Sequence, residues 1–334
     1  MVLGNMKQKM RGEEKMIVIT GAAGFIGSCL VKYLNEQNFF RLVLIDDLKI
    51  EDQWTNLVGK KFEAIISQAD TFRFLQGRGE EIFALIHLGA CSDTTEKNAD
   101  FLLENNYRFS IKLAEYAFEH AIRFIYASSA ATYGDGTLGF SDDESKLESL
   151  HPLNMYGYSK HLFDLWLFSQ KLLGKVVGLK YFNVFGPNEY HKGRMASMIY
   201  HMFFQVQNEG KVRLFKSNSP MYKDGEQCRD FIYVKDAVRM TASFLNNDFC
   251  GIFNIGSGKR ESWNSLACKL FDAMNRKVSI EYIDMPENLY AQYQNDTCAE
   301  MKKYFALFPE CPMTEIESSV KEYVQEYLLR KKRW

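Results

Sequence analysis

The sequence lacks three features, and each absence narrows the class of protein. No apolar run approaches the ~18–20 residues that a membrane-spanning helix needs. The 41 Lys and Arg residues are balanced by 42 Asp and Glu residues, and the formal net charge of -1 gives no reason to expect nucleic acid or an anionic membrane as a partner. The seven cysteines are an odd number without a Cys-x-x-Cys pair. Reduced thiols in a cytoplasmic protein are therefore expected.

Metal-ligand spacing is also missing around the six histidines, so no metal site is predicted. The length of 334 residues allows one large domain or two modest ones. Residues 1–15 are polar and lack the apolar core of a secretory signal, so they are interpreted as an extension before the first strand. The short basic stretch Arg330–Arg333 is interpreted as a solvated tail.

A glycine-rich turn follows the first apolar run. Residues 16–20 are typical of a buried strand, and residues 28–35 have helical periodicity. Between them lie Gly21, Gly24 and Gly27, which let the backbone turn sharply and approach a pyrophosphate at the helix N-terminus. The pattern predicts nucleotide binding, with a plain tight turn as the alternative.

Strands and helices alternate along the first half of the chain. Apolar runs at residues 41–45, 83–88, 123–127 and 175–182 predict strands, and residues 100–120 predict an amphipathic helix. This alternation predicts an α/β fold with a Rossmann-type doubly wound parallel sheet. Asp46 and Asp47 follow the second strand, where an acidic residue usually holds a ribose 2′-hydroxyl and favours NAD. Solvated loop carboxylates are the other interpretation.

The composition of the sequence changes after Pro187. Residues 188–194 and 215–229 form polar loops, and the apolar runs at 231–234 and 251–256 return to the first domain. We therefore predict an NAD(P)-binding Rossmann domain over residues 16–186 plus 231–262, and a smaller α/β substrate-binding lobe over residues 187–230 plus 263–330. Basic side chains in the first loop suit a phosphorylated or nucleotide-linked substrate, although solvated loop charge is the simpler reading.

Tyr156 and Lys160 carry the strongest catalytic signal. Their spacing of four residues puts both on one face of a helix, where a cationic lysine favours the phenolate. A tyrosine with an ordinary pKa of about 10 needs such help to act as a base near neutral pH. Ser128 and Ser129 follow a strand and could bond a substrate alcohol or cap the next turn. A Tyr-x-x-x-Lys spacing alone is common by chance. The glycine turn and the serines elsewhere in the sequence support its catalytic interpretation here.

The chain from Met16 to Tyr327 resembles the extended short-chain dehydrogenase/reductase family. The family pattern is present as Thr-Gly-x-x-Gly-x-x-Gly over residues 20–27, a serine at Ser129, and Tyr-x-x-x-Lys over residues 156–160. Within the family, residues 89–96, 127–134, 181–184 and 191–197 are similar to the epimerases that invert C6″ of an ADP-linked heptose for the lipopolysaccharide inner core. The resemblance implies a nucleotide-sugar substrate, transient oxidation by a bound dinucleotide and a homo-oligomer, without nucleic-acid or membrane partners.

The resemblance also implies residue roles. Tyr156 and Lys192 would be acid/base groups on opposite sides of the sugar, Lys160 would hold the nicotinamide ribose, and Ser129 would orient the C6″ oxygen. Cofactor-binding positions would be Gly21, Gly24, Phe25, Ile26, Gly27, Asp46, Asp47, Leu88, Gly89, Ala90, Cys91, Ser92, Asn105, Lys160, Val184 and Lys192. Substrate-binding positions would be Ser92, Asn183, Arg194, His201, Phe215, Arg229 and Tyr293.

Some positions depart from the family pattern. The resemblance implies NADP. Members of this branch, however, carry Asn at the position of Asp47 and a lysine near the position of Gln53, so NAD stays possible for this chain. Leu88 replaces an acidic residue and Arg194 a small polar one. A nucleotide-sugar 4-epimerase and a non-catalytic dinucleotide sensor remain open alternatives. Ala130 and Ala131 stand where 4,6-dehydratases carry an acidic pair, which disfavours that activity.

Overall fold

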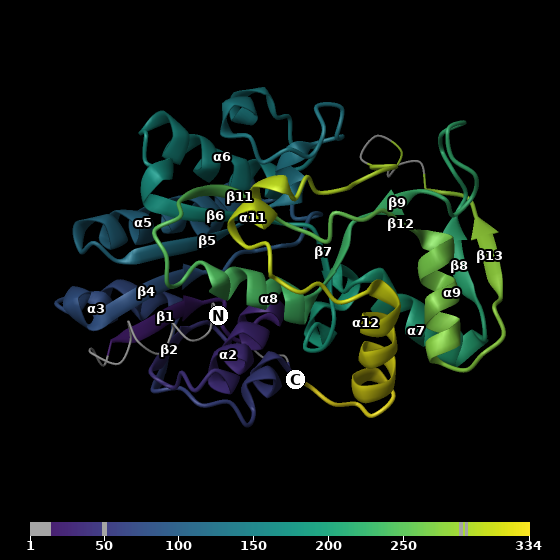
Figure 1. The fold of residues 1–334 in the computed structure, drawn as a ribbon, viewed down its shortest axis with the longest axis horizontal. Coiled ribbons are helices and arrows are strands. Elements are labelled where there is room, and N and C mark those ends of the chain that lie inside the picture. Colours follow the sequence, from purple (N-terminus) through teal and green to yellow (C-terminus); the bar gives the residue numbers. More distant parts are fainter. Residues whose placement is uncertain (1–14, 49–51, 287–289, 291–292) are drawn as a thin grey trace.

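The computed structural model describes residues 15–48, 52–286, 290 and 293–334. Nearly all of the predicted extension, residues 1–14, lies outside the described residues. Seven parallel strands form one sheet in the order β11-β6-β5-β4-β1-β2-β3 (Figure 1). This confirms the predicted Rossmann-type doubly wound fold. The strands are β1 Met16–Thr20, β2 Leu42–Ile45, β3 Ala64–Ile66, β4 Ile82–His87, β5 Arg123–Ser129, β6 Val176–Tyr181 and β11 Gly251–Ile255.

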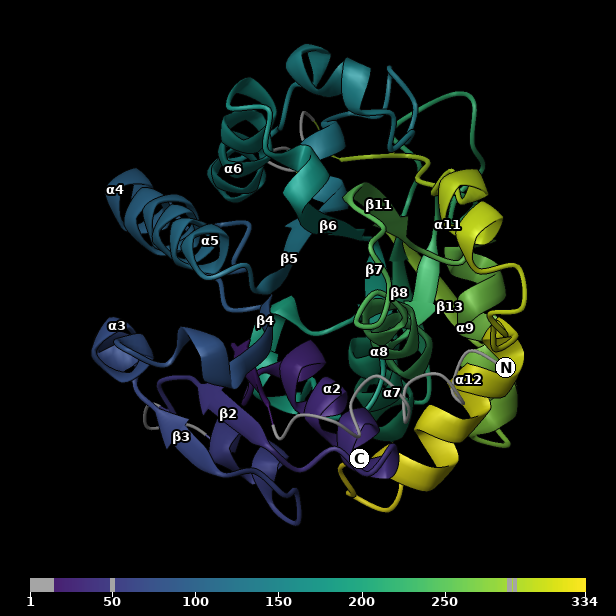
Figure 2. The same ribbon diagram turned by 60° about the vertical axis from the view of Figure 1, so that its left-hand side comes forward.

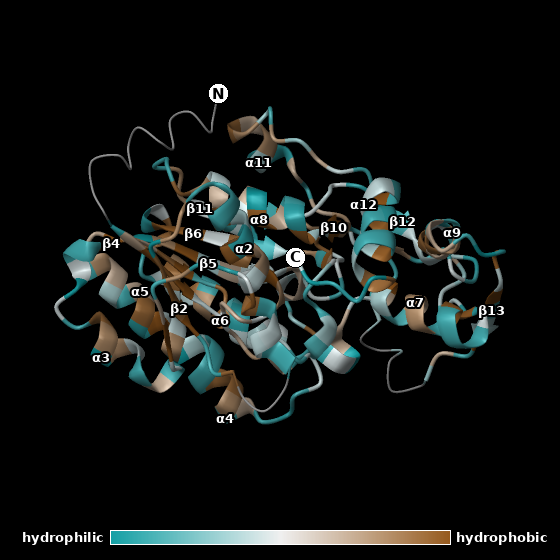
Figure 3. Ribbon diagram, turned by 90° about the horizontal axis from the view of Figure 1, so that it is seen from below, coloured by the Kyte–Doolittle hydropathy of each residue, from teal (hydrophilic) through white to brown (hydrophobic). Residues whose placement is uncertain are grey.

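Helices cover both faces of this sheet. Helices α2 (Phe25–Glu36) and α8 (Val234–Ser243) lie on one side, and α5 (Phe109–Glu119) and α6 (Met155–Ser169) lie on the other (Figure 2). Every residue of β1, β2, β6 and β11 is buried, which explains why these strands read as continuous apolar runs. The strands are accordingly the most hydrophobic part of the ribbon in Figure 3.

The predicted helix over residues 100–120 is interrupted. Helix α4 (Ala99–Leu102) leads into a π-helical turn, Leu103–Arg108, before α5 begins. A π-turn inserts an extra residue and re-aims the side chains around it, and such turns are frequent at functional sites. This one carries Asn105 and Asn106.

Three two-stranded sheets and several helices complete the chain, mostly to the right in Figure 1. Most of these elements fall in the predicted substrate lobe, whose division from the Rossmann domain stays a prediction. The strand pairs are β7 (Asn183–Phe185) with β10 (Phe231–Tyr233), β8 (Val212–Phe215) with β13 (Ile280–Ile283), and β9 (Cys228–Arg229) with β12 (Glu261–Ser262). The helices are α3 (Thr71–Leu75), α7 (Met198–Glu209), α9 (Trp263–Ala273), α11 (Lys302–Leu307) and α12 (Ile316–Glu322).

The last residues pack against the body of the protein. Arg333 donates a hydrogen bond from Nε to Oδ1 of Asn56 (2.9 Å), and its guanidinium lies 5.1 Å from the ring centroid of Tyr190. The backbone N–H of Trp334 donates to Oδ1 of Asn188 (2.9 Å). The interpretation of Arg330–Arg333 as a solvated tail is therefore wrong for Arg333, whose partners come from distant parts of the chain.

We predict that Gly27→Ala lowers stability, because a Cβ at this position would lie 2.0 Å from the backbone oxygen of Gly21. Overpacking of this kind costs about 1–3 kcal/mol. Thermal unfolding of both proteins measures the loss. Gly174→Ala is the matched control, since nothing lies within 4 Å of its added Cβ. Equal melting temperatures for Gly27→Ala and the control would contradict the prediction.

Candidate active site

The glycine turn and the loop after β4 meet at the carboxyl edge of the sheet. Gly21 has φ 66°, and a Cβ there would lie 2.6 Å from the Cα of Gly89. The N–H of Gly89 donates to Oγ1 of Thr20 (3.1 Å), which fixes this approach. Helix α2 starts immediately afterwards, and its first turn has no side-chain cap. Its free amide groups can therefore bind a pyrophosphate.

The acidic pair after β2 is held beside this turn. One carboxylate oxygen of Asp46 accepts a hydrogen bond from the N–H of Ala23 (2.8 Å), and the other accepts from Nε2 of Gln53 (3.3 Å). Burial raises the pKa of Asp46, and the bond from Ala23 opposes that shift. Asp47 accepts from the N–H of Gln68 (3.0 Å). Two carboxylates therefore border the place where an adenosine ribose would lie.

A buried histidine lies beneath the two loops. His87 ends β4, and its Nδ1 pairs with Oγ1 of Thr20 (2.6 Å) while its Nε2 pairs with Oγ of Ser110 (2.8 Å). Burial lowers the pKa of His87 to about 3, so the ring is neutral near neutral pH. The sequence analysis missed this residue because its partners lie far away along the chain.

Asn106 joins the loop after β4 to helix α6. Its Oδ1 accepts from the N–H of Cys91 (2.9 Å), and its Nδ2 donates to the oxygen of Cys91 (3.0 Å) and to Oγ of Ser159 (3.0 Å). The Ser159 hydroxyl in turn donates to the backbone oxygen of Tyr156 (2.7 Å). The predicted cofactor residue Asn105 bonds to Gln68 and to Asn106 instead (both 3.0 Å). The π-turn thus presents Asn106 to the site, a residue that the sequence analysis did not assign.

The predicted Ser129, Tyr156 and Lys160 come together around the start of α6. Asn154 caps this helix, accepting from the N–H of Gly157 (2.8 Å). Burial raises the pKa of Tyr156, and its hydrogen bond with the Ser129 hydroxyl opposes the shift. The net shift runs opposite to the predicted lowering, because burial outweighs that bond and Lys160 is not among its causes. Lys160 is 4% exposed, and burial lowers its pKa from 10.5 to about 8.

Lys192 lies beside Phe25, the first residue of α2. It belongs to a 3₁₀ segment, Tyr190–Met195, and its Nζ is 5.7 Å from the ring centroid of Phe25. Burial lowers the pKa of Lys192, and the neighbouring Glu189 opposes the shift. Arg194, in the same segment, forms an ion pair of 2.7 Å with Asp93 in the loop after β4. The segment thereby reaches two of the loops that surround the predicted cofactor site.

Glu189 holds this segment in place. Its carboxylate is buried and accepts from the Ser197 hydroxyl (2.7 Å), the Tyr323 hydroxyl (2.9 Å) and the N–H of Gly186 (3.2 Å). Burial raises the pKa of Glu189, and its bonds with Ser197 oppose the shift. Its position directly before Tyr190 and the His-Lys-Gly stretch was the only sequence signal for this role.

Two of the predicted substrate residues, Arg229 and Tyr293, meet beside the β9–β12 sheet. The Arg229 guanidinium lies 5.0 Å from the ring centroid of Tyr293 and 5.4 Å from that of Trp263. Arg229 belongs to the two-stranded β9–β12 sheet, and Trp263 begins α9. A cation flanked by two rings can hold an anionic or aromatic ligand. Sequence reasoning had not assigned Trp263.

The remaining predicted residues fall on four segments. Leu88, Gly89, Ala90, Cys91 and Ser92 form the loop after β4, while Asn183 and Val184 lie in β7. The amide of Asn183 donates to the backbone oxygen of Asp230 (3.2 Å). His201 in α7 pairs with the backbone oxygen of Arg194 (3.3 Å). Phe215 ends β8, a strand of the predicted substrate-binding lobe.

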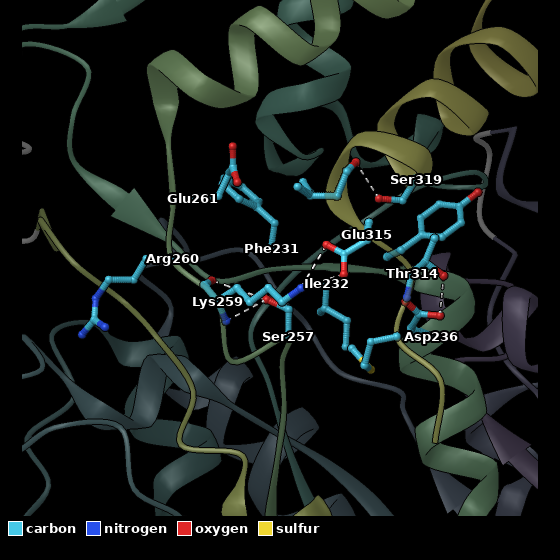
Figure 4. Close-up of a pocket in the computed structure, with 13 residues that line it drawn as sticks. Phe231, Ile232, Asp236, Ser257, Lys259, Arg260, Glu261, Thr314, Glu315 and Ser319 are labelled. Carbon is cyan, nitrogen blue, oxygen red and sulfur yellow. Dashed lines mark hydrogen bonds and ion pairs between the residues drawn. The ribbon is translucent and has the colours of Figure 1, made fainter. Parts of the chain in front are cut away.

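A separate cavity of about 170 Å³ lies between β10, α8 and α12 (Figure 4). Two of its charged groups have partners within its own wall. Lys259 pairs with Glu315 (2.8 Å), and Asp236 accepts from the hydroxyl of Thr314 (2.9 Å). The predicted catalytic residues do not line it, so it is distinct from the candidate active site.

The fold and this site define a dinucleotide-dependent enzyme of the doubly wound class, and comparison with known proteins specifies it. Residues 17–256 match the model of the NAD dependent epimerase/dehydratase family. The chain belongs to this family, so its cofactor is a nicotinamide dinucleotide. Among the described residues, no helix has the length and apolar character to cross a membrane.

Several relatives that match over nearly the whole chain share one name. The chain is 49% identical over 317 residues to an ADP-L-glycero-D-manno-heptose-6-epimerase of Nitratidesulfovibrio vulgaris strain DP4, covering 94% of this chain and 98% of that protein. It is 44% identical over 327 residues to the protein of the same name from Fusobacterium nucleatum, with the same coverage. The crystal structure of the Helicobacter pylori protein of that name has a TM-score of 0.78 at 28% identity, covering 94% of this chain and 96% of that one.

We predict that Glu189→Gln destabilises the protein, because an amide nitrogen would face groups that donate to the carboxylate. Losing hydrogen bonds to a buried charged acceptor costs about 1.5–3 kcal/mol. Denaturant unfolding measures this loss. Tyr323→Phe removes a single donor and serves as the milder control. A Glu189→Gln protein as stable as the parent would show that the carboxylate does not anchor the Lys192 segment.

Proposed function

We propose that this protein is an ADP-glyceromanno-heptose 6-epimerase, which interconverts ADP-D-glycero-β-D-manno-heptose and ADP-L-glycero-β-D-manno-heptose in lipopolysaccharide inner-core biosynthesis. Relatives at 44–49% identity over nearly the full length carry that name. The structural observation that carries the proposal is the presence of two acid/base candidates on separate elements: Tyr156 in α6, hydrogen-bonded to Ser129, and Lys192 in the 3₁₀ segment beside Phe25.

Inversion at C6″ explains why two such groups are needed. The bound dinucleotide supplies hydride transfer to and from C6″, so the cofactor is regenerated and no net oxidation occurs. When the hydride leaves, one base takes the hydroxyl proton and C6″ becomes a planar ketone. The ketone must present its other face before hydride and proton return. A single base cannot easily serve both geometries, so a second group on the far side completes the reaction.

Each residue then has a definite task. Tyr156 exchanges a proton with the C6″ oxygen, and Ser129, which is hydrogen-bonded to it, orients that oxygen. Lys192 exchanges the proton in the other geometry; its lowered pKa makes proton release easier. Lys160 holds the nicotinamide ribose as a buried cation. Arg229 between Trp263 and Tyr293 suits the nucleotide or diphosphate of the substrate.

The direct test is incubation of the purified protein with ADP-D-glycero-β-D-manno-heptose, followed by separation of the two C6″ epimers. We expect an equilibrium mixture of both. Tyr156→Phe and Lys192→Ala should each lower the rate by at least ~100-fold, since loss of a general acid/base typically costs 10²–10⁴-fold.

Melting temperature is the control for both variants, and retained dinucleotide is a further control for Tyr156→Phe; these quantities should match the parent. Full activity in either variant would remove that residue from the pair of acid/base groups. No conversion by the parent protein with its cofactor bound would overturn the substrate assignment and direct the search to other nucleotide sugars, including those epimerised at C4.

We propose NADP as the dinucleotide, as the family branch implies, and one specific observation favours NAD as the alternative. A 2′-phosphate beside the adenosine ribose would meet the carboxylates of Asp46 and Asp47, and Gln53 stands near the position where the branch carries a lysine. Release and identification of the bound nucleotide distinguishes the two.

We predict that Asp47→Asn raises the affinity for NADP relative to NAD, because it removes one negative charge from the surroundings of the 2′-phosphate. A change of roughly tenfold in the affinity ratio corresponds to about 1.4 kcal/mol of electrostatic free energy. Titration of the cofactor-free protein with each dinucleotide measures the ratio. Asp52→Asn, a nearby acidic residue in a separate 3₁₀ turn, is the control. An unchanged ratio would place Asp47 away from the 2′-phosphate.

A further inference from the structure

A fully buried ion pair lies behind the predicted catalytic residues. Asp164 in α6 and Lys180 in β6 are 0% and 1% exposed, and their charged atoms are 3.4 Å apart. The pair is fully satisfied by its neighbours. Tyr126 donates to Oδ1 of Asp164 (2.8 Å), Ser128 donates to Oδ2 (2.7 Å), and Lys180 donates to Oγ1 of Thr132 (2.7 Å). Burying two charges is costly, so such a pair needs a compensating role.

The hydrogen bonds of this ion pair involve residues that precede and follow Ser129 in the sequence. Ser128 precedes Ser129 at the end of β5, and the Thr132 hydroxyl donates to the backbone oxygen of Ser129 (2.7 Å). The Lys180 ammonium also lies 4.5 Å from the ring centroid of Tyr133, in the same 3₁₀ turn. Asp164 and Lys180 therefore fix the strand end and the turn that carry the serine.

Asp164 of this pair belongs to α6, the helix that also carries Tyr156. Asp164 follows Lys160 by four residues, so the two side chains lie on one face of α6, one turn apart. At the top of the helix, a Cβ on Gly157 would lie 2.8 Å from the backbone oxygen of Ala131. Helix and turn are thus in close contact at Gly157 and joined by charged groups at Asp164.

We propose that Asp164 and Lys180 are positioning residues for the epimerase site: they hold Ser129 against Tyr156, and Asp164 places a carboxylate one helical turn from Lys160. This inference rests on the proposed function and deepens it. Neither residue touches the reacting atoms. Their contribution acts through Ser129 on one side and through Lys160 on the other.

The charges around Lys160 define the expected pH dependence. Burial lowers the pKa of Lys160 to about 8, and the Asp164 carboxylate is the group that opposes this shift. The titratable groups that face Asp164 are Lys160 and His161 on its own helix, Tyr126 on β5 and Lys180 on β6; Asp142 and Tyr133 border the pair from the following loop. Lys160 loses its charge as pH rises through its pKa, so activity should fall on the alkaline side.

The test compares Asp164→Asn, Lys180→Met and the double variant with the parent protein. Asp164→Asn removes the carboxylate that favours protonated Lys160, so the alkaline limb of kcat should move down by roughly one pH unit. Lys180→Met leaves that carboxylate in place, so its limb should stay at or above the parental position. Each single change also leaves a buried charge without a partner and should lower the melting temperature.

The double variant separates positioning from mere stability. Removing both charges should restore part of the melting temperature, because no buried charge is left without its partner, although the amide introduced by Asp164→Asn still faces the hydroxyl donors of Tyr126 and Ser128. Its alkaline limb should stay low, and kcat should remain at least ~10-fold below the parent with little change in KM. Lys32→Met with Glu36→Gln, a surface pair on α2, is the matched control and should change neither quantity.

Two outcomes would overturn the inference. The first is an alkaline limb at the parental pH in all variants; the second is a double variant that recovers full kcat together with its stability. Retention of bound dinucleotide against pH reads the charge of Lys160 without substrate. The two proposals can fail separately. If the parent protein does not convert the heptose, the proposed function is contradicted. If the Asp164→Asn variant then still loses its dinucleotide at a lower pH than the parent does, the role of Asp164 is supported.

Discussion

The close approach of Gly21 to Gly89 is the contact on which the site depends. Parallel strands buried on both faces bring their carboxyl ends to one edge, and side chains at that edge would ordinarily keep the following loops apart. Here two residues without side chains let the backbones touch, with a Cβ at Gly21 only 2.6 Å from its neighbour. The hydroxyl of Thr20 and the neutral ring of His87 lock the contact from beneath. The amides of α2 are thereby presented to the crevice.

Buried polar groups support each wall of this crevice. His87 lies under the glycine turn, Asp164 and Lys180 lie behind the serine and the tyrosine helix, and Glu189 lies under the segment of Lys192. Each has its hydrogen bonds satisfied by groups from other elements. A satisfied network of this kind rigidifies its surroundings, whereas removal of one partner leaves a costly unpaired group. The walls are consequently held more rigidly than a purely apolar core would hold them.

The sequence predicted the sheet, the glycine turn and the main motif residues because these depend on local periodicity and spacing. It did not reveal β3, a part-exposed edge strand of only three residues, or the π-turn that aims Asn106 rather than Asn105 at Cys91. The roles of Asn106, Glu189 and Asp164 depend on partners distant in sequence, and a single chain gives no sign of such pairing. For the same reason Arg333 was misjudged as solvated. The predicted lowering of the Tyr156 pKa failed because burial cannot be read from a four-residue spacing.

The ion pair between Arg194 and Asp93 joins the segment of Lys192 to the loop after β4. Its arginine side chain is 69% exposed, so water and salt weaken the attraction, and such pairs contribute about 1 kcal/mol or less. That free energy is comparable to thermal energy, so the two loops can separate often and without a concerted rearrangement. An anionic ligand would offer Arg194 a phosphate in exchange for a carboxylate, leaving its ionic interaction intact. Binding of such a ligand would then replace one ionic partner of Arg194 by another.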